Sequence, residues 1–347
     1  MAEDHSSSPC GELGPRNLSD LVSDAASKPV DSTGSIPIPF GWFRVADSAD
    51  LNSGEIITLR ACARELVVWR TADGEAACAD AFCPHLGAHL GMGGRVVGDS
   101  LVCPFHGWSF DTGGKNCDIP YSDRTNGRAR LLTHPVVERN GFVLAWIHPE
   151  GSAPTFDVPE LPEVLDPEFL PYIVSSYIVN TSVQEMGENA VDRCHFPSVH
   201  LNKVPPEIIE YDTTSDIARI LSRLLLITPY GDFPGEIEIH QYGPGFSATR
   251  FRGFVDTLLV ATQTPIDANQ CELRFYFTVR RTGYGESSEE EARALALVYT
   301  GHIDEQARED IPIWENKVYI ESPALSDVDG PILEYRRWAK RFHSILS

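Results

Sequence analysis

The sequence predicts an α+β protein of two domains, a small all-β domain followed by an antiparallel sheet with helices. Three observations support this fold class. Residues 36–150 contain short β-type runs separated by turn residues, without helical periodicity. Residues 151–347 contain longer β-type stretches together with three helical patterns. The length of 347 residues leaves room for two domains of ordinary size.

The first domain is expected to follow a flexible tail. Residues 1–35 are rich in Ser, Asp, Pro and Gly, a composition typical of disorder. Within residues 36–150 five short strands are expected, at 56–59, 66–69, 76–79, 101–103 and 142–146. Residues 117–121 are expected to pack beneath the loop that precedes them.

The second domain begins with a linker over residues 150–171, which is rich in Pro, Glu and Asp. Strands are expected at 172–183, 217–227, 236–241, 255–264 and 272–279. One helix is predicted over 182–194 and another over 333–346. A third begins at an N-cap, Ser287 or Ser288, and Pro312 should end or kink it.

Two cysteine–histidine motifs lie in the first domain. Reduced to possible metal ligands they read Cys83-x-His85, seventeen residues, then Cys103-x-x-His106. Two cysteines and two histidines fit either tetrahedral zinc or a Rieske [2Fe–2S] cluster. A zinc finger keeps its two cysteines together and its two histidines together, whereas here each cysteine is coupled to a histidine. The spacing therefore predicts a Rieske cluster.

Composition narrows the class of protein further. The contents of 42% hydrophobic and 22% charged residues indicate a globular chain, and no apolar run approaches the ~20 residues of a membrane span. The formal net charge of −22 argues against nucleic acid and anionic membranes as partners. The six cysteines outside the two motifs show no disulfide-framework spacing, so a cytoplasmic location is expected.

A second set of possible ligands lies in the second domain. On the predicted helix, Asn189, Asp192 and His195 are spaced by three and share one face. His200 is five residues beyond His195, and Pro197 should break the helix and turn His200 back. Two histidines and one carboxylate with open positions form the site of non-haem Fe(II) oxygenases. The residues alone leave three carboxylates open for the third position, Asp304, Glu309 and Asp310.

These motifs resemble those of the Rieske-type oxygenases. Leu86 replaces an arginine common in that family, but it is not at a ligand position. Residues 189–200 are similar to the family's iron motif, Asn-x-x-Asp-x-x-His-x-x-x-x-His. Residues 310–317 resemble the Asp-x-x-Ile-Trp-x-x-Lys element of Rieske steroid oxygenases, whose aspartate binds iron. Residues 118–121, 242–246 and 334–338 are similar to the branch of 3-ketosteroid 9α-hydroxylases and cholesterol 7-desaturases.

The resemblance implies roles for particular residues. Cys83, His85, Cys103 and His106 would hold the cluster, and His195, His200 and Asp310 would hold a mononuclear Fe(II). Asn189 and Asp192 are the implied catalytic residues, with Asp192 linking a histidine ligand to the cluster of a neighbouring subunit. The implied fold is an all-β Rieske domain, then a helix-grip-like antiparallel sheet.

The resemblance also implies an activity. It is the O₂-dependent hydroxylation or desaturation of an apolar polycyclic, steroid-like substrate by a homotrimer. Electrons would come from NAD(P)H through a ferredoxin or ferredoxin reductase. One alternative is a tailoring oxygenase acting on a non-steroid natural product or an aromatic compound. A remoter one is a non-catalytic electron carrier, which needs only about the first 150 residues and has no use for residues 189–200.

Overall fold

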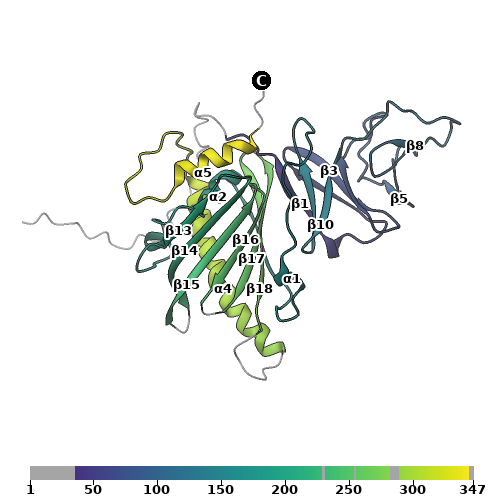
Figure 1. Ribbon diagram of the computed structural model, residues 1–347. Helices are drawn as coiled ribbons and strands as arrows, with labels where there is room; N and C mark the ends of the chain where they lie inside the picture. Colours follow the sequence, from purple (N-terminus) through teal and green to yellow (C-terminus); the bar gives the residue numbers. More distant parts are fainter. Residues whose placement is uncertain (1–35, 229–230, 254, 282–288, 344–347) are drawn as a thin grey trace, which may run out of the picture. The chain divides into compact units, whose positions relative to one another are not determined.

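Figure 1 shows a computed structural model that describes residues 36–228, 231–253, 255–281 and 289–343. The tail expected over residues 1–35 lies outside the described residues. Short strands and one 3-10 turn, η2, make up the first part of the chain. The elements are β1 Gly41–Asp47, η2 Ser48–Asp50, β2 Ile56–Ala61, β3 Arg64–Arg70, β4 Ala76–Asp80, β5 Arg95–Val97, β6 Ser100–Val102, β7 Ser109–Phe110, β8 Asn116–Asp118, β9 Thr133–His134, β10 Val136–Arg139 and β11 Phe142–Ile147.

These strands form three small antiparallel sheets in the part of the chain that the structure describes. Their orders are β1-β11-β10, β2-β3-β4-β9 and β5-β6-β7-β8. All five strands predicted for the first domain are present, with small differences at their ends. One apolar core joins the second and third sheets and includes Trp69, Leu101 and Phe110, each fully buried. The prediction of an all-β first domain is confirmed.

One larger antiparallel sheet dominates the second part of the chain. Its order is β12-β18-β17-β16-β15-β14-β13. The strands are β12 Ile173–Val179, β13 Glu207–Asp212, β14 Ile217–Thr228, β15 Gly231–Tyr242, β16 Phe246–Arg252, β17 Thr257–Asp267 and β18 Gln270–Val279. The strands β13 and β16 were not predicted. Consecutive strands from β13 to β18 are neighbours, so the sheet is a meander, and β12 extends it by pairing with β18 at one edge.

Helices cover this sheet and its upper end (Figure 1). They are α1 Pro162–Leu165, α2 Val183–Glu188, α3 Phe196–Val199, α4 Glu289–Asn316, α5 Ile332–Ala339 and the 3-10 turn η3 Lys340–Phe342. The long helix α4 lies across one face of the sheet, where Ile303 packs with Phe251 and Phe277. Near its C-terminal end Trp314 packs with Val179 and Leu273. These contacts fix α4 over the sheet and confirm the predicted α+β architecture.

The helix predicted over residues 182–194 is shorter than expected, because α2 ends at Glu188. It begins where predicted, since Ser182 is its N-cap and accepts a hydrogen bond from the Glu185 backbone N–H at 3.3 Å. Beyond α2 the Asp192 carboxylate accepts the backbone N–H of Cys194 at 3.2 Å. Such a local side-chain bond competes with continued helical bonding. The prediction of one continuous helix to residue 194 is therefore wrong.

Two other helix boundaries differ from the prediction. Pro312 was expected to end or kink the helix; the end is wrong, because α4 continues to Asn316, and the kink stays a prediction. Pro312 lacks only the N–H that would bond to the carbonyl of Arg308, an exposed residue that water can reach. The last helix ends at Ala339 and passes into η3, rather than reaching residue 346. The candidate N-caps of α4, Ser287 and Ser288, lie outside the described residues.

A buried ion pair fastens α5 to α2. The Arg336 guanidinium donates to both carboxylate oxygens of Glu188, at 2.6 and 2.9 Å, and each side chain is 9% exposed. Gly187 allows the close approach, since a Cβ there would lie 2.1 Å from the Tyr335 hydroxyl oxygen. The C-terminal motif at residues 334–338 thus holds the segment that leads into residues 189–200.

Breaking this ion pair is expected to destabilise the fold. Arg336→Met leaves the Glu188 carboxylate buried without its partner, which should lower the free energy of unfolding by about 3–5 kcal/mol. Arg337→Met is the matched control, because the Arg337–Glu334 pair is exposed and should contribute about 0–1 kcal/mol. Urea unfolding followed by circular dichroism measures both. Equal losses in the two variants would contradict this role of Arg336.

The two parts of the chain share an apolar core. Trp42 and Trp146 of the first part pack with Tyr242, Phe246 and Tyr276 of the large sheet. The domain boundary placed at residue 150 stays a prediction. Among the described residues, no helix has the length and apolar character that crossing a bilayer requires.

Candidate metal centres

The two cysteine–histidine loops have the same backbone hydrogen bonding. In the first, the N–H of Cys83 donates to the carbonyl of Ala88, and the N–H of Gly87 donates back to the Cys83 carbonyl, both at 2.9 Å. The second loop repeats both bonds from Cys103, at 2.8 and 3.1 Å. Gly87 and Gly107 have φ of 76° and 72°, a left-handed conformation that glycine adopts without strain. The two loops thus hold Cys83 and Cys103 in the same backbone arrangement, although the histidine is two residues after the cysteine in the first loop and three after it in the second.

The predicted cluster ligands come together between these loops. The rings of His85 and His106 have centroids 4.7 Å apart, and both cysteines are 2% exposed. Burial raises the pKa of the Cys83 thiol to about 11; the His85 backbone N–H opposes this, and the neighbouring Cys103 adds to it. The Nδ1 atom of His106 is buried and has no hydrogen-bond partner among the described residues. Two contacting thiols and an unsatisfied imidazole nitrogen fit the Cys₂His₂ donor set of a Rieske cluster.

Residues 117–121 pack under the second loop, as predicted. Ile119 belongs to the core that contains both cysteines and Trp108. The indole N–H of Trp108 donates to the Tyr121 hydroxyl at 2.7 Å, and the His85 ring stacks on this indole with centroids 4.2 Å apart. These contacts fix the orientation of His85.

Cys103→Ser tests the first centre. The variant should lose the visible absorption and EPR signal of a Rieske cluster, because a serine hydroxyl does not replace a thiolate on iron. Mononuclear iron should stay, since the two candidate centres share no ligand. Cys117→Ser is the matched control, because Cys117 is exposed and lies 3.3 Å from the Ser100 hydroxyl. A normal cluster signal in the Cys103 variant would refute the assignment.

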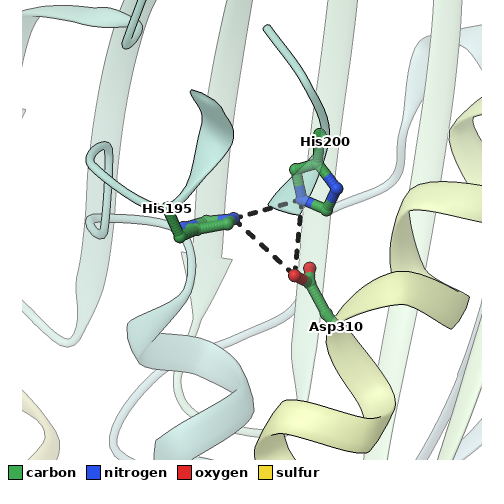
Figure 2. A group of neighbouring side chains, drawn as sticks. All are labelled: His195, His200 and Asp310. Carbon is green, nitrogen blue, oxygen red and sulfur yellow. Dashed lines mark hydrogen bonds and ion pairs between the residues drawn. The ribbon is translucent and has the colours of Figure 1, made fainter. Parts of the chain in front are cut away.

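A second donor set lies in the second part of the chain. Figure 2 shows His195, His200 and Asp310 pointing toward one another. The two Nε2 atoms are 3.2 Å apart, and Asp310 Oδ1 lies 3.8 Å from His195 Nε2 and 3.3 Å from His200 Nε2. The three ligand atoms, one from each residue, all lie within 4.8 Å of one another. The Asp310 and His200 side chains are 7% and 3% exposed, so the three donors converge in a largely dry site.

The short helix α3 brings the two histidines together. His195 is its N-cap and His200 its C-cap, and Pro197 lies in its first turn, where a missing N–H costs nothing. The prediction that Pro197 turns His200 back toward His195 is therefore right about the outcome. Its mechanism is wrong, because Pro197 opens a new helical turn rather than breaking a continuous helix.

Each of the three donors has a polar partner behind it. Glu309 Oε2 lies 2.8 Å from His200 Nδ1, and Asp192 Oδ2 lies 3.6 Å from His195 Nδ1. Asn189 donates to Asp310 Oδ2 at 3.0 Å. Partners of this kind orient metal ligands and select the ring nitrogen that faces the metal. Asn189 and Asp192 thus lie beside the site as predicted, although both follow the end of α2 and do not share one helical face.

The carboxylates around His200 and His195 also set proton affinities. Burial lowers the pKa of His200, but Asp310 and Glu309 outweigh it and raise that pKa above the ordinary value. For Asp192, burial raises the pKa, while His195 and the backbone N–H groups of Cys194 and His195 lower it to a net value below the usual range. Asp310 and Glu309 favour a proton on His200. A divalent cation bound at this site would replace that proton.

The structure separates the three carboxylates that the residues alone left open. Asp304 points elsewhere and accepts from Ser175 at 2.6 Å, Tyr177 at 2.7 Å and Arg308 at 3.0 Å. Glu309 contacts His200 Nδ1, whereas Asp310 faces the other ring nitrogen, Nε2. Only Asp310, among these three, reaches both Nε2 atoms. The supporting role of Glu309 was not predicted; its position next to Asp310 was the available signal.

An apolar pocket opens beside the second centre. Its empty volume, including space open to solvent, is about 970 Å³. Residues from the turn after α2, from β14 to β16 and from α4 line it. The apolar members include Leu224, Leu225, Ile237, Ile239, Phe251 and Ile303. Asn189 and Asp192 also line the pocket, which places it next to the candidate iron ligands. Sequence reasoning missed these strand residues, because alternation marks a buried face without distinguishing a pocket from a core.

Comparison with known families gives two matches that together span most of the chain. Residues 41–135 match the Rieske [2Fe–2S] domain, and residues 145–343 match the 3-ketosteroid 9α-hydroxylase C-terminal domain. A cholesterol 7-desaturase of Xenopus laevis is 31% identical over 335 residues, covering 88% of this chain and 72% of that protein. The oxygenase component of a 3-ketosteroid-9-alpha-monooxygenase from Rhodococcus rhodochrous is 30% identical, covering 87% of this chain and 83% of that protein.

Solved structures share the fold at lower identity. NdmA of Pseudomonas putida CBB5, a QL mutant solved with caffeine, has a TM-score of 0.69 at 21% identity, covering 86% of this chain and 89% of that one. Dicamba monooxygenase has a TM-score of 0.66 at 18% identity, covering 88% and 97%. At these identities the likeness concerns the fold alone.

Proposed function

This chain belongs to the Rieske oxygenases that carry the 3-ketosteroid 9α-hydroxylase C-terminal domain, and we propose that it oxidises an apolar, polycyclic, steroid-like substrate. The relatives are named for two outcomes, monooxygenation and desaturation, and the proposal includes both. The observation that carries the proposal is the convergence of His195, His200 and Asp310 at the wall of a large apolar pocket.

Two metal cofactors fit the residues described above. Cys83, His85, Cys103 and His106 would hold the Rieske cluster, and the convergent histidines and aspartate would hold Fe(II). When bound, the cluster supplies electrons one at a time, and Fe(II) supplies a site for the reduction of O₂.

The protein contributes orientation and exclusion of water. Asn189 fixes the rotation of the Asp310 carboxylate by donating to the oxygen that faces away from the histidines. Glu309 accepts from His200 Nδ1 and thereby keeps Nε2 free to bind a metal. Apolar side chains from β14 to β16 hold a polycyclic substrate against α4 and keep bulk water away.

An oxygenase component of this kind takes its electrons from a separate protein. We propose that this donor is a ferredoxin or ferredoxin reductase that draws on NAD(P)H, and that the enzyme works in the cytoplasm as a homotrimer. Large apolar side chains around the cluster loops support docking at that end, since they are more than half exposed. They are Phe82, Leu86, Met92, Phe105 and Tyr121.

Substrate-dependent O₂ consumption tests the proposed function. A panel of sterols and ketosteroids, supplied with a ferredoxin–reductase pair and NADH, should include a compound that raises O₂ uptake and yields a product carrying one added oxygen or one added double bond. A panel of non-steroid aromatic compounds is run alongside. Activity confined to the second panel would favour a tailoring oxygenase. Cluster reduction without O₂ uptake for any compound would favour an electron carrier.

A further inference from the structure

Three polar side chains that line the apolar pocket have buried atoms whose hydrogen-bonding capacity is unused. Arg193 Nε, Asn202 Oδ1 and His302 Nε2 are buried, and none has a hydrogen-bond partner among the residues that the structure describes. Asn202 is only 7% exposed. Buried polar groups in folded proteins are nearly always satisfied. Three unsatisfied atoms on residues of one pocket point to a ligand that supplies the missing bonds.

His302 lies well away from the metal ligands. It belongs to α4 and precedes Asp310 by eight residues, with Gln306 halfway between them. Because residues four apart share a helix face, these three side chains follow one line along α4. At about 1.5 Å per residue, His302 is about 12 Å from Asp310 along the helix axis. Ile303 and Phe251, which pack together, line the pocket along this stretch.

We propose that His302 binds a hydrogen-bonding oxygen of the substrate at the end of the pocket remote from the metal ligands. This inference rests on the proposed function, because it takes the pocket as the substrate site. It narrows the substrate class to elongated apolar molecules in which an oxygen lies on the order of 10 Å from the oxidised carbon. Nε2 donates to a ketone or accepts from a hydroxyl, according to the tautomer of the ring.

Asn202 is a second residue that can bind an oxygen of the substrate. Its Oδ1 only accepts hydrogen bonds, so a substrate hydroxyl satisfies it whereas a ketone does not. The other unused donor, Arg193, lies two residues before the candidate ligand His195 in sequence. At the end of the pocket remote from the metal ligands, a ketone therefore depends on His302, and a hydroxyl has two possible partners. This difference makes ketone and alcohol probes informative about which residue binds the oxygen.

Binding measurements with matched steroids test the proposal without requiring turnover. The probes are 5α-androstan-3-one, its 3β-alcohol and the hydrocarbon 5α-androstane, which share one ring skeleton. Equilibrium dialysis of labelled probes against the iron-loaded enzyme, without O₂, gives the dissociation constants. The decisive quantity is the ratio of hydrocarbon to ketone dissociation constants. His302→Leu should lower this ratio about tenfold relative to wild type, because one buried hydrogen bond is lost.

Three further variants keep the result interpretable. Ile303→Ala removes apolar contact and should weaken all three probes while leaving the ratio unchanged. His302→Gln retains a hydrogen-bonding group and should keep part of the preference, which covers the case in which the leucine variant folds poorly. Asn202→Leu should affect the alcohol and spare the ketone. Iron content and circular dichroism verify that each variant is folded.

Two outcomes would overturn the assignment. The ratio of His302→Leu could equal that of wild type, or the ketone preference could disappear in Asn202→Leu instead. In each case steroid-dependent O₂ uptake would still stand, so the proposed function survives while the role of His302 fails. Wild-type enzyme that neither binds these steroids nor consumes O₂ with any steroid would refute both.

Discussion

Replacing Asp310 with alanine is expected to abolish mononuclear iron binding while leaving the Rieske cluster unchanged. Asp310 is the only carboxylate among the three neighbouring candidates whose oxygen approaches both His195 Nε2 and His200 Nε2. Its removal leaves two neutral imidazoles for Fe²⁺, a cation that prefers an anionic ligand beside them. Iron affinity should fall by more than about 100-fold, beyond the loss typical of outer partners. Metal analysis after dialysis against a weak chelator measures the loss, and O₂ uptake should fall with it.

Neighbouring carboxylates on α4 provide the controls for this experiment. Glu305→Ala should leave iron and activity unchanged, because Glu305 is 60% exposed and pairs only with Arg308 among the described residues. Glu309→Ala should weaken iron binding about 10- to 100-fold, as expected for a partner behind a ligand. Full iron in Asp310→Ala together with its loss in Glu309→Ala would assign the ligand to Glu309 instead.

Replacing Asp192 with asparagine should separate metal binding from turnover. The Asp192 carboxylate lies 3.6 Å from His195 Nδ1, and its side chain remains 45% exposed. It can therefore orient His195 on one side and, as we propose, accept an N–H from His106 of a neighbouring subunit on the other. The asparagine variant keeps the shape but places an amide between the two rings. Both metals and the oligomer should be retained, and turnover should fall by about 10- to 100-fold.

The rate of cluster reoxidation distinguishes this role from a structural one. The chemically reduced enzyme is mixed with O₂ and substrate, and the recovery of cluster absorbance is followed in a stopped-flow instrument. Asp192→Asn should recover much more slowly than wild type. Asp327→Asn, an exposed change in the loop after α4, should recover at the wild-type rate. Recovery of Asp192→Asn at the wild-type rate would leave Asp192 with only its local hydrogen bond to Cys194.

Short motifs determine those features that could be predicted from the sequence. The two cysteine–histidine loops were found because the coupled Cys–His spacing is specific to one kind of metal site, and the structure gives both loops the same hydrogen bonding. His195 and His200 were found because Pro197 between them accounts for an interval that a continuous helix does not allow. Choosing Asp310 over Asp304 and Glu309 needed family resemblance, since all three belong to one helix.

Other features depended on tertiary contacts that local patterns do not reveal. The helix predicted to residue 194 ends at Glu188, where the local bond from Cys194 to Asp192 replaces helical bonding, and the ion pair with Arg336, nearly 150 residues away in sequence, holds that end in place. Helix α4 continues past Pro312 because Trp314, two residues beyond, packs against β12 and β18. The pocket wall was missed because alternation in β14 and β15 does not distinguish a pocket from a core, and because β16 became recognisable only when paired with β15 and β17.

Iron and acid-labile sulfide, measured per chain, decide whether one chain holds both a two-iron cluster and a separate mononuclear iron. We predict about three irons and about two sulfides per chain in the wild type. Asp310→Ala should contain about two irons with unchanged sulfide, and Cys103→Ser about one iron with no sulfide. About two irons in the wild type, with no change on loss of Asp310, would contradict the two-centre assignment and leave a one-centre electron carrier.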